Sequence, residues 1–251
     1  MAGALLDREL KVTWLTKALI LSVDQVPIVD ARQLLREGLL AEGLGREAAV
    51  KTVTALSRIW LLPVQRQDPW TTWALTVERD LRDLRPFHLG ALLATEPFFR
   101  SLLEAVGREA RASESVNTIA VRKRLRDQYG PRRLIDVATQ KGVKTLRDLG
   151  LLIGEPASSI SRVGNLEISD PELAAWLVRC LLEGRGSESI PQAELTHAPE
   201  FFGLSLPRAL PRRAAGITQH AEGLGRTVLA RSIPAASSTI RPEATPAAHL
   251  S

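Results

Sequence analysis

The sequence predicts a mainly α-helical protein, in which a helical array precedes a winged-helix module with a short β-hairpin wing and a smaller, winged-helix-like C-terminal piece. Only 4% of the 251 residues are aromatic although 45% are hydrophobic, so Leu, Ala, Val and Ile must fill the core. A composition rich in Leu, Ala and Arg favours helices, because unbranched side chains lose little rotamer freedom there. Apolar residues recur at helical spacing, and short alternating runs follow a strongly basic stretch.

Changes in composition along the chain predict four segments. They are a helical domain at 1–112, a winged-helix DNA-binding module at 113–184, a smaller winged-helix-like piece at 185–232 and a flexible tail at 233–251. The tail is expected because Pro, Ala, Ser and Thr dominate it without periodicity. Charged residues within the first ten positions argue against a signal peptide, and no apolar run approaches the roughly 20 residues of a membrane span. We therefore expect a cytoplasmic protein with no membrane contact.

Helix signals in the first segment come in five stretches. They are predicted at 31–40 with Asp30 as N-cap, at 46–62 with Pro63 as the stop, from Asp68-Pro69 to about residue 81, at 87–93 after Pro86, and at 98–106 after Pro97. The Trp and Phe side chains of these stretches are interpreted as core.

The positive charge is concentrated in one window of the chain. Residues 117–147 hold nine basic and two acidic residues, a net charge of +7 against +5 for the whole chain. A polyanion is the natural partner of such a window. Two helices fit it, 117–129 and 132–150, separated by Gly130-Pro131. Because glycine inside a helix costs about 1 kcal/mol, the alternative is two short helices with a turn at Lys141-Gly142.

The second of these helices has the pattern of a recognition helix. Its apolar stripe consists of Leu134, Ile135, Ala138, Gly142, Leu146 and Leu149. Its opposite face carries Arg133, Gln140, Lys141, Lys144, Arg147 and Asp148. A cationic face of this kind suits phosphates and the base edges of a major groove.

A wing is predicted after this helix. Two alternating runs, 160–163 and 166–168, flank Gly164-Asn165. Because both turn residues tolerate positive φ, the pattern predicts a tight hairpin. Arg162 would then lie near the wing tip, within reach of a phosphate or the minor groove. The alternative is a solvated helical face followed by an ordinary β-hairpin.

Two further elements are predicted toward the C-terminus. Asp170 as N-cap and Pro171 open a helix that runs to Glu183 and ends at Gly184. Beyond a Pro-rich stretch with three arginines, 217–231 predicts a hairpin with its turn at 222–225, which forms part of the second winged-helix-like piece.

Motifs for catalysis or cofactor binding are absent from the sequence. The four histidines are dispersed, and none has a partner three or four residues away that would form a helical metal pair. There is no P-loop, dinucleotide fingerprint or nucleophile elbow, and the acidic residues do not cluster as two-metal chemistry requires. Cys180, the only cysteine, lies in an apolar run and is interpreted as a buried hydrophobe. We expect a non-enzymatic protein without cofactor or metal.

The order of several patterns carries a family resemblance. A Leu-rich helix at 33–40 leads to a long helix at 48–62, then to the apolar segments 87–93 and 98–103, and finally to the basic, Leu-ending helix at 140–152. Over roughly residues 30–168 this order resembles the BrxA family of bacterial BREX phage-defence systems. The resemblance implies a helical domain like that of the antitermination factor NusB, a winged-helix part, binding to double-stranded DNA, and a role in phage defence without known catalysis.

These observations predict a DNA-binding accessory protein of a defence system, with double-stranded DNA and other defence-system proteins as partners. The residues expected to contact DNA are Arg122, Lys123, Arg126, Arg132, Arg133, Lys141, Lys144, Thr145 and Arg147 on the helices and Arg162 on the wing. One alternative is a winged-helix transcriptional regulator, which would prefer a single operator sequence. The other is a helical scaffold that binds partner proteins or structured RNA.

Overall fold

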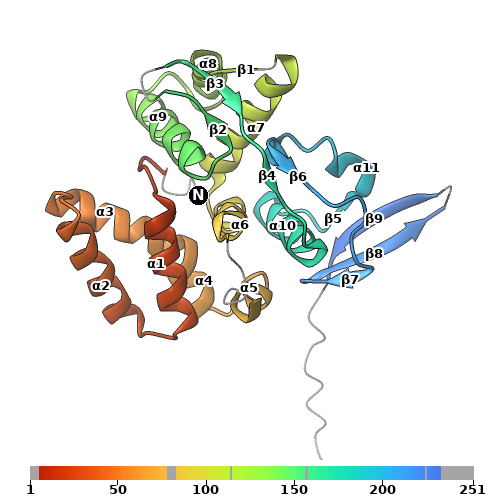
Figure 1. The fold of residues 1–251 in the computed structure, drawn as a ribbon, viewed down its shortest axis with the longest axis horizontal. Helices are drawn as coiled ribbons and strands as arrows, with labels where there is room; N and C mark the ends of the chain where they lie inside the picture. Colours follow the sequence, from red (N-terminus) through yellow and green to blue (C-terminus); the bar gives the residue numbers. More distant parts are fainter. Residues whose placement is uncertain (1–5, 78–82, 114, 156–157, 224, 233–251) are drawn as a thin grey trace, which may run out of the picture.

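The structure is a computed structural model that describes residues 6–77, 83–113, 115–155, 158–223 and 225–232. Helices dominate it, as predicted, and small sheets accompany them in the second half of the chain (Figure 1). The tail predicted at 233–251 lies outside the described residues. Within the described part, no helix combines the length and the apolar character that crossing a bilayer demands.

The N-terminal array contains all five predicted helical stretches, with different ends. Its elements are α1 (Val12–Val23), α2 (Ile28–Ala41), α3 (Arg46–Leu56), the π-helical turn η1 (Ser57–Leu61), α4 (Leu62–Gln65), α5 (Thr71–Val77), α6 (Arg85–Thr95) and α7 (Pro97–Ala112). Asp30 lies in the first turn of α2 rather than at its N-cap. Pro86 lies in the first turn of α6, where a missing N–H costs no hydrogen bond. Pro63 is the second residue of α4, which follows η1 directly. The helix predicted to stop at Pro63 therefore continues past it, through a π-helical turn.

The aromatic residues form the centre of a continuous hydrophobic core, as predicted. Trp60, Trp70, Trp73, Phe87 and Trp176 make a chain of ring contacts with centroids 5.1–6.2 Å apart. The same core cluster includes buried residues of the N-terminal array, of the basic helices and of the C-terminal sheet. In its middle, α6 packs against α7, α1 and the later helix α10 (Pro171–Arg185).

The basic window forms two helices, as predicted, and a three-stranded sheet closes the module. Its elements are β1 (Ser115–Asn117), α8 (Thr118–Tyr129), α9 (Arg133–Asp148), β2 (Leu152–Ile153) and β3 (Ile160–Val163). The antiparallel strand order is β1-β3-β2. α9 is unbroken at Gly142, so the alternative turn there is wrong. A Cβ on Gly142 would lie 2.3 Å from Cδ2 of Leu102 in α7, and this close packing explains the glycine.

The predicted hairpin turn at Gly164-Asn165 is wrong. β3 pairs with β1 and β2, whereas β4 (Leu166–Glu167) pairs in parallel with β6 (Leu204–Ser205) in a different sheet. Gly164 is required for close approach rather than for positive φ, because a Cβ there would lie 1.9 Å from the carbonyl oxygen of Gly150. The hairpin of this module instead joins β2 to β3, through residues 154–159, of which 156 and 157 lie outside the described residues.

α10 leads into the C-terminal sheet. Asp170 caps this helix as predicted, but the helix continues through Gly184 and ends at Gly186, where φ is +65°. Gly184 lies against the carbonyl oxygen of Leu93, which would be only 2.0 Å from a Cβ. The remaining elements are β5 (Ser189–Pro191), α11 (Gln192–Leu195), the 3-10 turn η3 (Pro199–Phe201), β7 (Arg213–Ala214), β8 (Ile217–Glu222) and β9 (Arg226–Arg231).

The predicted hairpin at 217–231 is confirmed as β8 and β9. The piece around it is a four-stranded antiparallel sheet of order β5-β9-β8-β7. Among the described residues of 187–232, only α11 and η3 are helical, so this piece lacks the pair of long helices that a winged-helix module needs.

Candidate nucleic-acid interface

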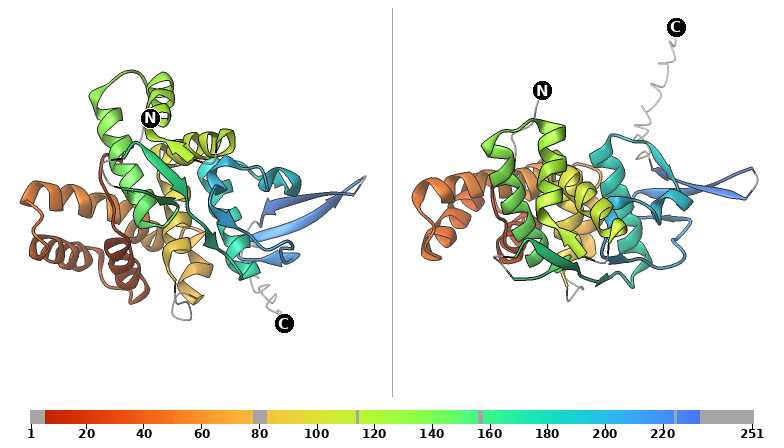
Figure 2. Two further views of the ribbon diagram at one scale, coloured as in Figure 1. Left: turned by 45° about the horizontal axis from the view of Figure 1, so that its top comes forward. Right: turned by 90° about the horizontal axis from the view of Figure 1, so that it is seen from above.

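A groove of about 530 Å³ lies between α8, α9 and the residues that precede β3. The two helices run side by side, as the green helices in the right-hand view of Figure 2 show. The basic side chains that line the groove are Arg122 from α8 and Arg133, Lys144 and Arg147 from α9. All four belong to the set predicted to contact DNA.

Local capping fixes the first turn of α8 at the rim of this groove. The Asn117 side chain accepts a hydrogen bond from the backbone N–H of Ile119, at 2.9 Å. The backbone N–H and the Oγ1 hydroxyl of Thr118 both donate to the Ser159 carbonyl, at 2.8 and 3.1 Å. The helix therefore begins against the residue that precedes β3, and these hydrogen bonds set its position relative to the groove.

Arg147 ties α9 to the start of β3. Its Nη2 donates to the carbonyl oxygen of Ser158 and to the Oγ of Ser161, both at 3.1 Å. Arg147 thus holds α9 and the start of β3 together from inside the groove. Arg122 and Arg133, by contrast, form no ion pair with any side chain of the described residues.

Asp136, the one acidic residue lining the groove, is neutralised by Arg126 of α8. The Arg126 Nε donates to Asp136 Oδ1 at 2.6 Å. This hydrogen bond, together with the attraction of Arg126 and Arg122, holds the pKa of the Asp136 carboxyl below its ordinary value. Asp136 is therefore ionised at neutral pH, and Arg126 offsets its repulsion toward an anion.

Thr145 and Arg162, both predicted to contact DNA, lie outside the groove, and neither has the position predicted for it. Thr145 is fully buried, and its Oγ1 accepts a hydrogen bond from the backbone N–H of Leu10 at 2.9 Å, because this side of α9 faces the N-terminal segment. Arg162 lies in the middle of β3, paired with Ser115 and Ile153, and not at a wing tip. Since its neighbour Ser161 faces Arg147, strand alternation directs Arg162 to the opposite face of the sheet.

Lys123, Arg132 and Lys141 are outside the set of residues that line the groove, whereas Lys144 belongs to it. Lys123 and Arg132 are exposed and make no ion pair within the described part of the chain. Lys141 and Lys144 both approach the Glu9 carboxylate, at 3.7 and 3.4 Å, so an acidic side chain of the N-terminal segment partly neutralises this end of α9.

Some groove residues were not singled out from the sequence. Ile119 is 53% exposed and brings an apolar side chain to the groove wall, and Leu134, predicted to be buried, is 48% exposed. Ser158 and Ser159 also line the groove. They belong to the connection between β2 and β3, whereas the sequence predicted a hairpin after β3. The signal for this position was Gly154, a turn residue between the apolar pair Leu152-Ile153 and the run at 160–163.

The cysteine predicted to be a buried hydrophobe lies in the core. Cys180 is fully buried, and burial raises the pKa of its thiol well above the ordinary value. Among the described residues, no three His, Cys, Asp or Glu side chains gather in a way that could hold a metal ion. No protein-family model, curated protein or solved structure matches this chain.

Proposed function

We propose that this protein binds double-stranded DNA through the α8–α9 groove, without catalysing a reaction on it. The observation that carries the proposal is the pair Arg122 and Arg133, two guanidinium groups without an ion-pair partner among the described residues, on the two helices that line one groove. Arginine fits phosphate oxygens through its planar array of donors, and a groove lined by such side chains attracts a polyanion.

The chain order around the groove supports a winged-helix interpretation. Helix α7 is followed by β1, α8, α9, β2 and β3, with β3 between the other two strands. In a winged-helix module the second helix of the pair enters the major groove and the β-hairpin reaches an adjacent backbone. Here α9 would be that recognition helix, and the β2–β3 connection would be the wing.

The chemistry of the groove favours contacts to phosphate over contacts to one base sequence. Apart from Asp136, its charged side chains are cations, which bind phosphate oxygens whatever the base sequence. Its arginines could pair with guanine, and Gln140 is the one amide in the lining that could pair with adenine. Together with the resemblance of 30–168 to the BrxA family, this favours an accessory DNA-binding role in phage defence over that of a transcriptional regulator.

Charge reversal tests the proposal. Arg122→Glu with Arg133→Glu should weaken the binding of a labelled duplex about tenfold or more in a gel titration, while the circular dichroism spectrum stays unchanged. A matched control, Arg36→Glu with Arg46→Glu, makes the same change in net charge at two exposed sites on α2 and α3. Single substitution of Arg133 by Ala should lower the slope of log affinity against log salt by about 1, as expected for one lost phosphate contact. Equal loss of binding in groove and control variants would refute a localised interface.

A helical scaffold for a partner protein is the second candidate. Of the large hydrophobic side chains in the described residues that are more than a third exposed, five lie on α1–α3: Ile20, Val29, Leu34, Leu40 and Val50. Val29, at 73%, is the most exposed of them. A scaffold would keep its partners when the groove variant loses DNA, and would release them on Val29→Asp with Val50→Asp; co-purification of both variants separates the two functions.

A further inference from the structure

The outer face of the C-terminal sheet is a second basic surface. Cross-strand partners share one face of a sheet, and the register places Arg213 opposite Thr218, and Glu222 opposite Arg226. Strand alternation brings all four to the same face, away from the buried Ile217. Arg213 and Arg226 are exposed, as are Arg208 and Arg212 on the segment that leads into β7.

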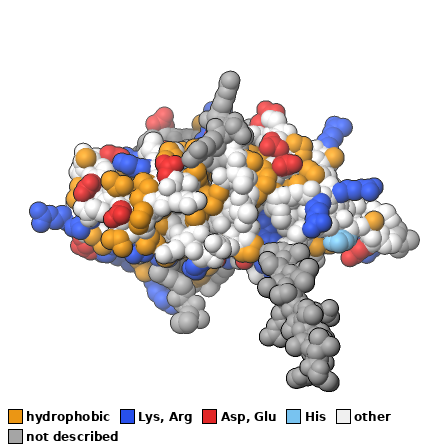
Figure 3. Space-filling view, turned by 90° about the horizontal axis from the view of Figure 1, so that it is seen from below, with side chains coloured by type: hydrophobic (Ala, Val, Ile, Leu, Met, Phe, Trp, Pro, Cys, Tyr) orange, Lys and Arg blue, Asp and Glu red, His pale blue; other side chains and the backbone are white. Residues whose placement is uncertain are grey.

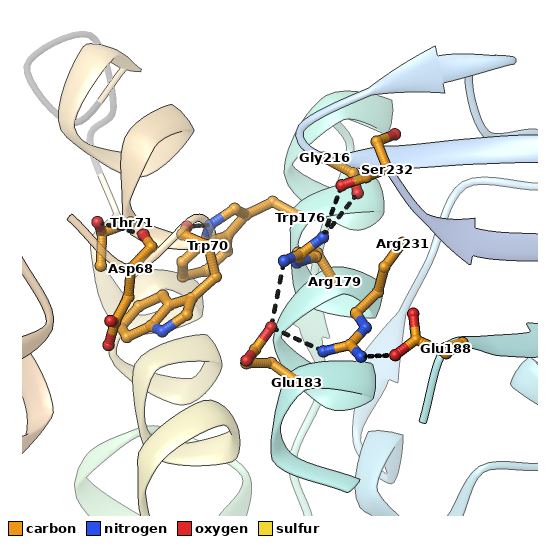
Figure 4. A network of polar contacts seen from close by, with 10 residues as sticks. All are labelled: Asp68, Trp70, Thr71, Trp176, Arg179, Glu183, Glu188, Gly216, Arg231 and Ser232. Atoms are coloured by element: carbon orange, nitrogen blue, oxygen red, sulfur yellow. Dashed lines mark hydrogen bonds and ion pairs between the residues drawn. The ribbon is translucent and has the colours of Figure 1, made fainter. Parts of the chain in front are cut away.

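The arginines of the two faces differ in whether a carboxylate neutralises their charge. On the inner side, Glu183 accepts hydrogen bonds from Arg179 at 3.2 Å and from Arg231 at 3.1 Å, and Glu188 pairs with Arg231 as well. Two carboxylates thus offset two guanidinium groups there (Figure 4). Arg213 and Arg226 on the outer face form no ion pair among the described residues, and the acid on their face is Glu222, opposite Arg226. Arg212 lies opposite Gln219 and is therefore directed to the other face. Figure 3 shows basic side chains gathered at this end of the molecule.

This sheet is held firmly to the helical core. Arg179 of α10 donates from Nη1 to the carbonyl oxygens of Gly216 and Ser232, at 3.3 and 3.2 Å, and so joins the helix to both ends of the β8–β9 hairpin (Figure 4). α10 is itself fixed to α5 and α6, since the Trp176 Nε1 donates to the Trp70 carbonyl at 2.7 Å and its ring packs on Phe87. The sheet therefore keeps a defined position relative to α8 and α9.

We propose that this outer face binds the phosphate backbone of a second double-stranded DNA segment, so that one chain bridges two duplexes. The β8–β9 hairpin extends from the body at the end of the molecule away from α8 and α9 (Figures 1 and 2). A two-stranded ribbon fits a major groove, and the arginines beside it meet phosphates. Binding by the sheet stands independently of the groove, whereas bridging rests on the proposed function.

A capture assay with the full chain tests the bridge. One duplex of about two helical turns is attached to beads, and retention of a second, fluorescent duplex is measured with the wild type, the groove variant Arg122→Glu with Arg133→Glu, and the sheet variant Arg213→Glu with Arg226→Glu. The variant Arg36→Glu with Arg46→Glu again controls for net charge. The sheet variant should lose capture about tenfold or more but bind one duplex within about threefold of wild type.

The outcomes separate the two proposals. Wild-type capture by the sheet variant, or complete loss of single-duplex binding in the groove variant, would overturn the second surface. Full binding by the groove variant with loss in the sheet variant would overturn the proposed groove function and leave the sheet as a binding site. If a mixture of the two variants restored capture, associated chains would form the bridge. That result would contradict bridging by a single chain. If the sheet variant unfolds in a thermal melt, Arg213→Gln with Arg226→Gln replaces it.

Discussion

His88 is enclosed in the helical core, with its Nε2 2.8 Å from the Thr16 hydroxyl. Its ring meets Trp60 edge-on, at 6.1 Å between centroids. Burial disfavours the charged imidazolium and lowers the pKa from an ordinary 6.5 to about 3. The histidine thus serves the core as a neutral side chain, at a position where the sequence offered no metal partner.

Acid should therefore destabilise the protein through His88. Between pH 6.5 and about 3 the unfolded chain takes up a proton that the folded chain does not, so this residue removes about 1.4 kcal/mol of stability per pH unit as the pH falls through that window. His88→Gln removes the titration and leaves an amide that can reach Thr16. Urea unfolding at pH 7 and pH 4.5 should show a smaller loss for the variant. The same loss in both proteins would exclude His88 as its source.

Arg147 and Arg133 line one groove but should respond differently to substitution. Arg147→Met leaves the Ser158 carbonyl and the Ser161 hydroxyl without this donor, and should lower the free energy of unfolding by about 1–3 kcal/mol. Arg133→Met removes no hydrogen bond or ion pair within the described residues, and should change the free energy of unfolding by less than about 0.5 kcal/mol. Both should weaken DNA binding. Equal stabilities in denaturant titrations would mean that Arg147 is not an anchor.

At the scale of elements, the helices that begin with a local capping signal could be predicted from the sequence. The β2–β3 hairpin could not. Asn117 and Asp170 cap their helices through bonds to residues two positions ahead, so the signal lies within a few residues. Gly142 packs closely against Leu102, and Gly164 against Gly150. These contacts join residues far apart in the sequence, so they could not be predicted without the fold. The same limit applies to Thr145. Its polar side chain suggested an exposed position, but the residue is buried beneath the N-terminal segment.

Substitution of Gly164 distinguishes a close contact from a turn. If the carbonyl of Gly150 excludes a side chain, Gly164→Ala should destabilise the protein by about 1–3 kcal/mol, and Gly164→Asn should be at least as harmful. At a hairpin turn with positive φ, Asn would instead be tolerated better than Ala. Thermal melts of the two variants decide between them, and a more stable Asn variant would restore the hairpin at 164–165.

At the scale of the molecule, charge is separated by position. The window 117–147 carries +7 while the whole chain carries +5, and the structure brings part of that window to a single groove. A second group of arginines lies on the C-terminal sheet, outside the window. Composition indicated a polyanion partner but not which cations would meet it. In the structure Arg126 pairs with Asp136, and Arg179 and Arg231 pair with acids. These ion pairs distinguish cations that stabilise the fold from cations left for a ligand.

Competition between duplexes should show how the whole molecule selects DNA. Phosphate contacts carry little sequence information, so if they dominate binding, a genomic duplex and its scrambled counterpart should compete within about tenfold. A transcriptional regulator would instead discriminate by about a thousandfold or more. Fluorescence anisotropy with equal-length competitors at fixed salt measures this ratio, and fixed salt is essential because a change from 50 to 200 mM alone can alter such affinities by about a thousandfold or more. A large ratio that vanished with Gln140→Ala would assign sequence reading to α9 and favour the regulator.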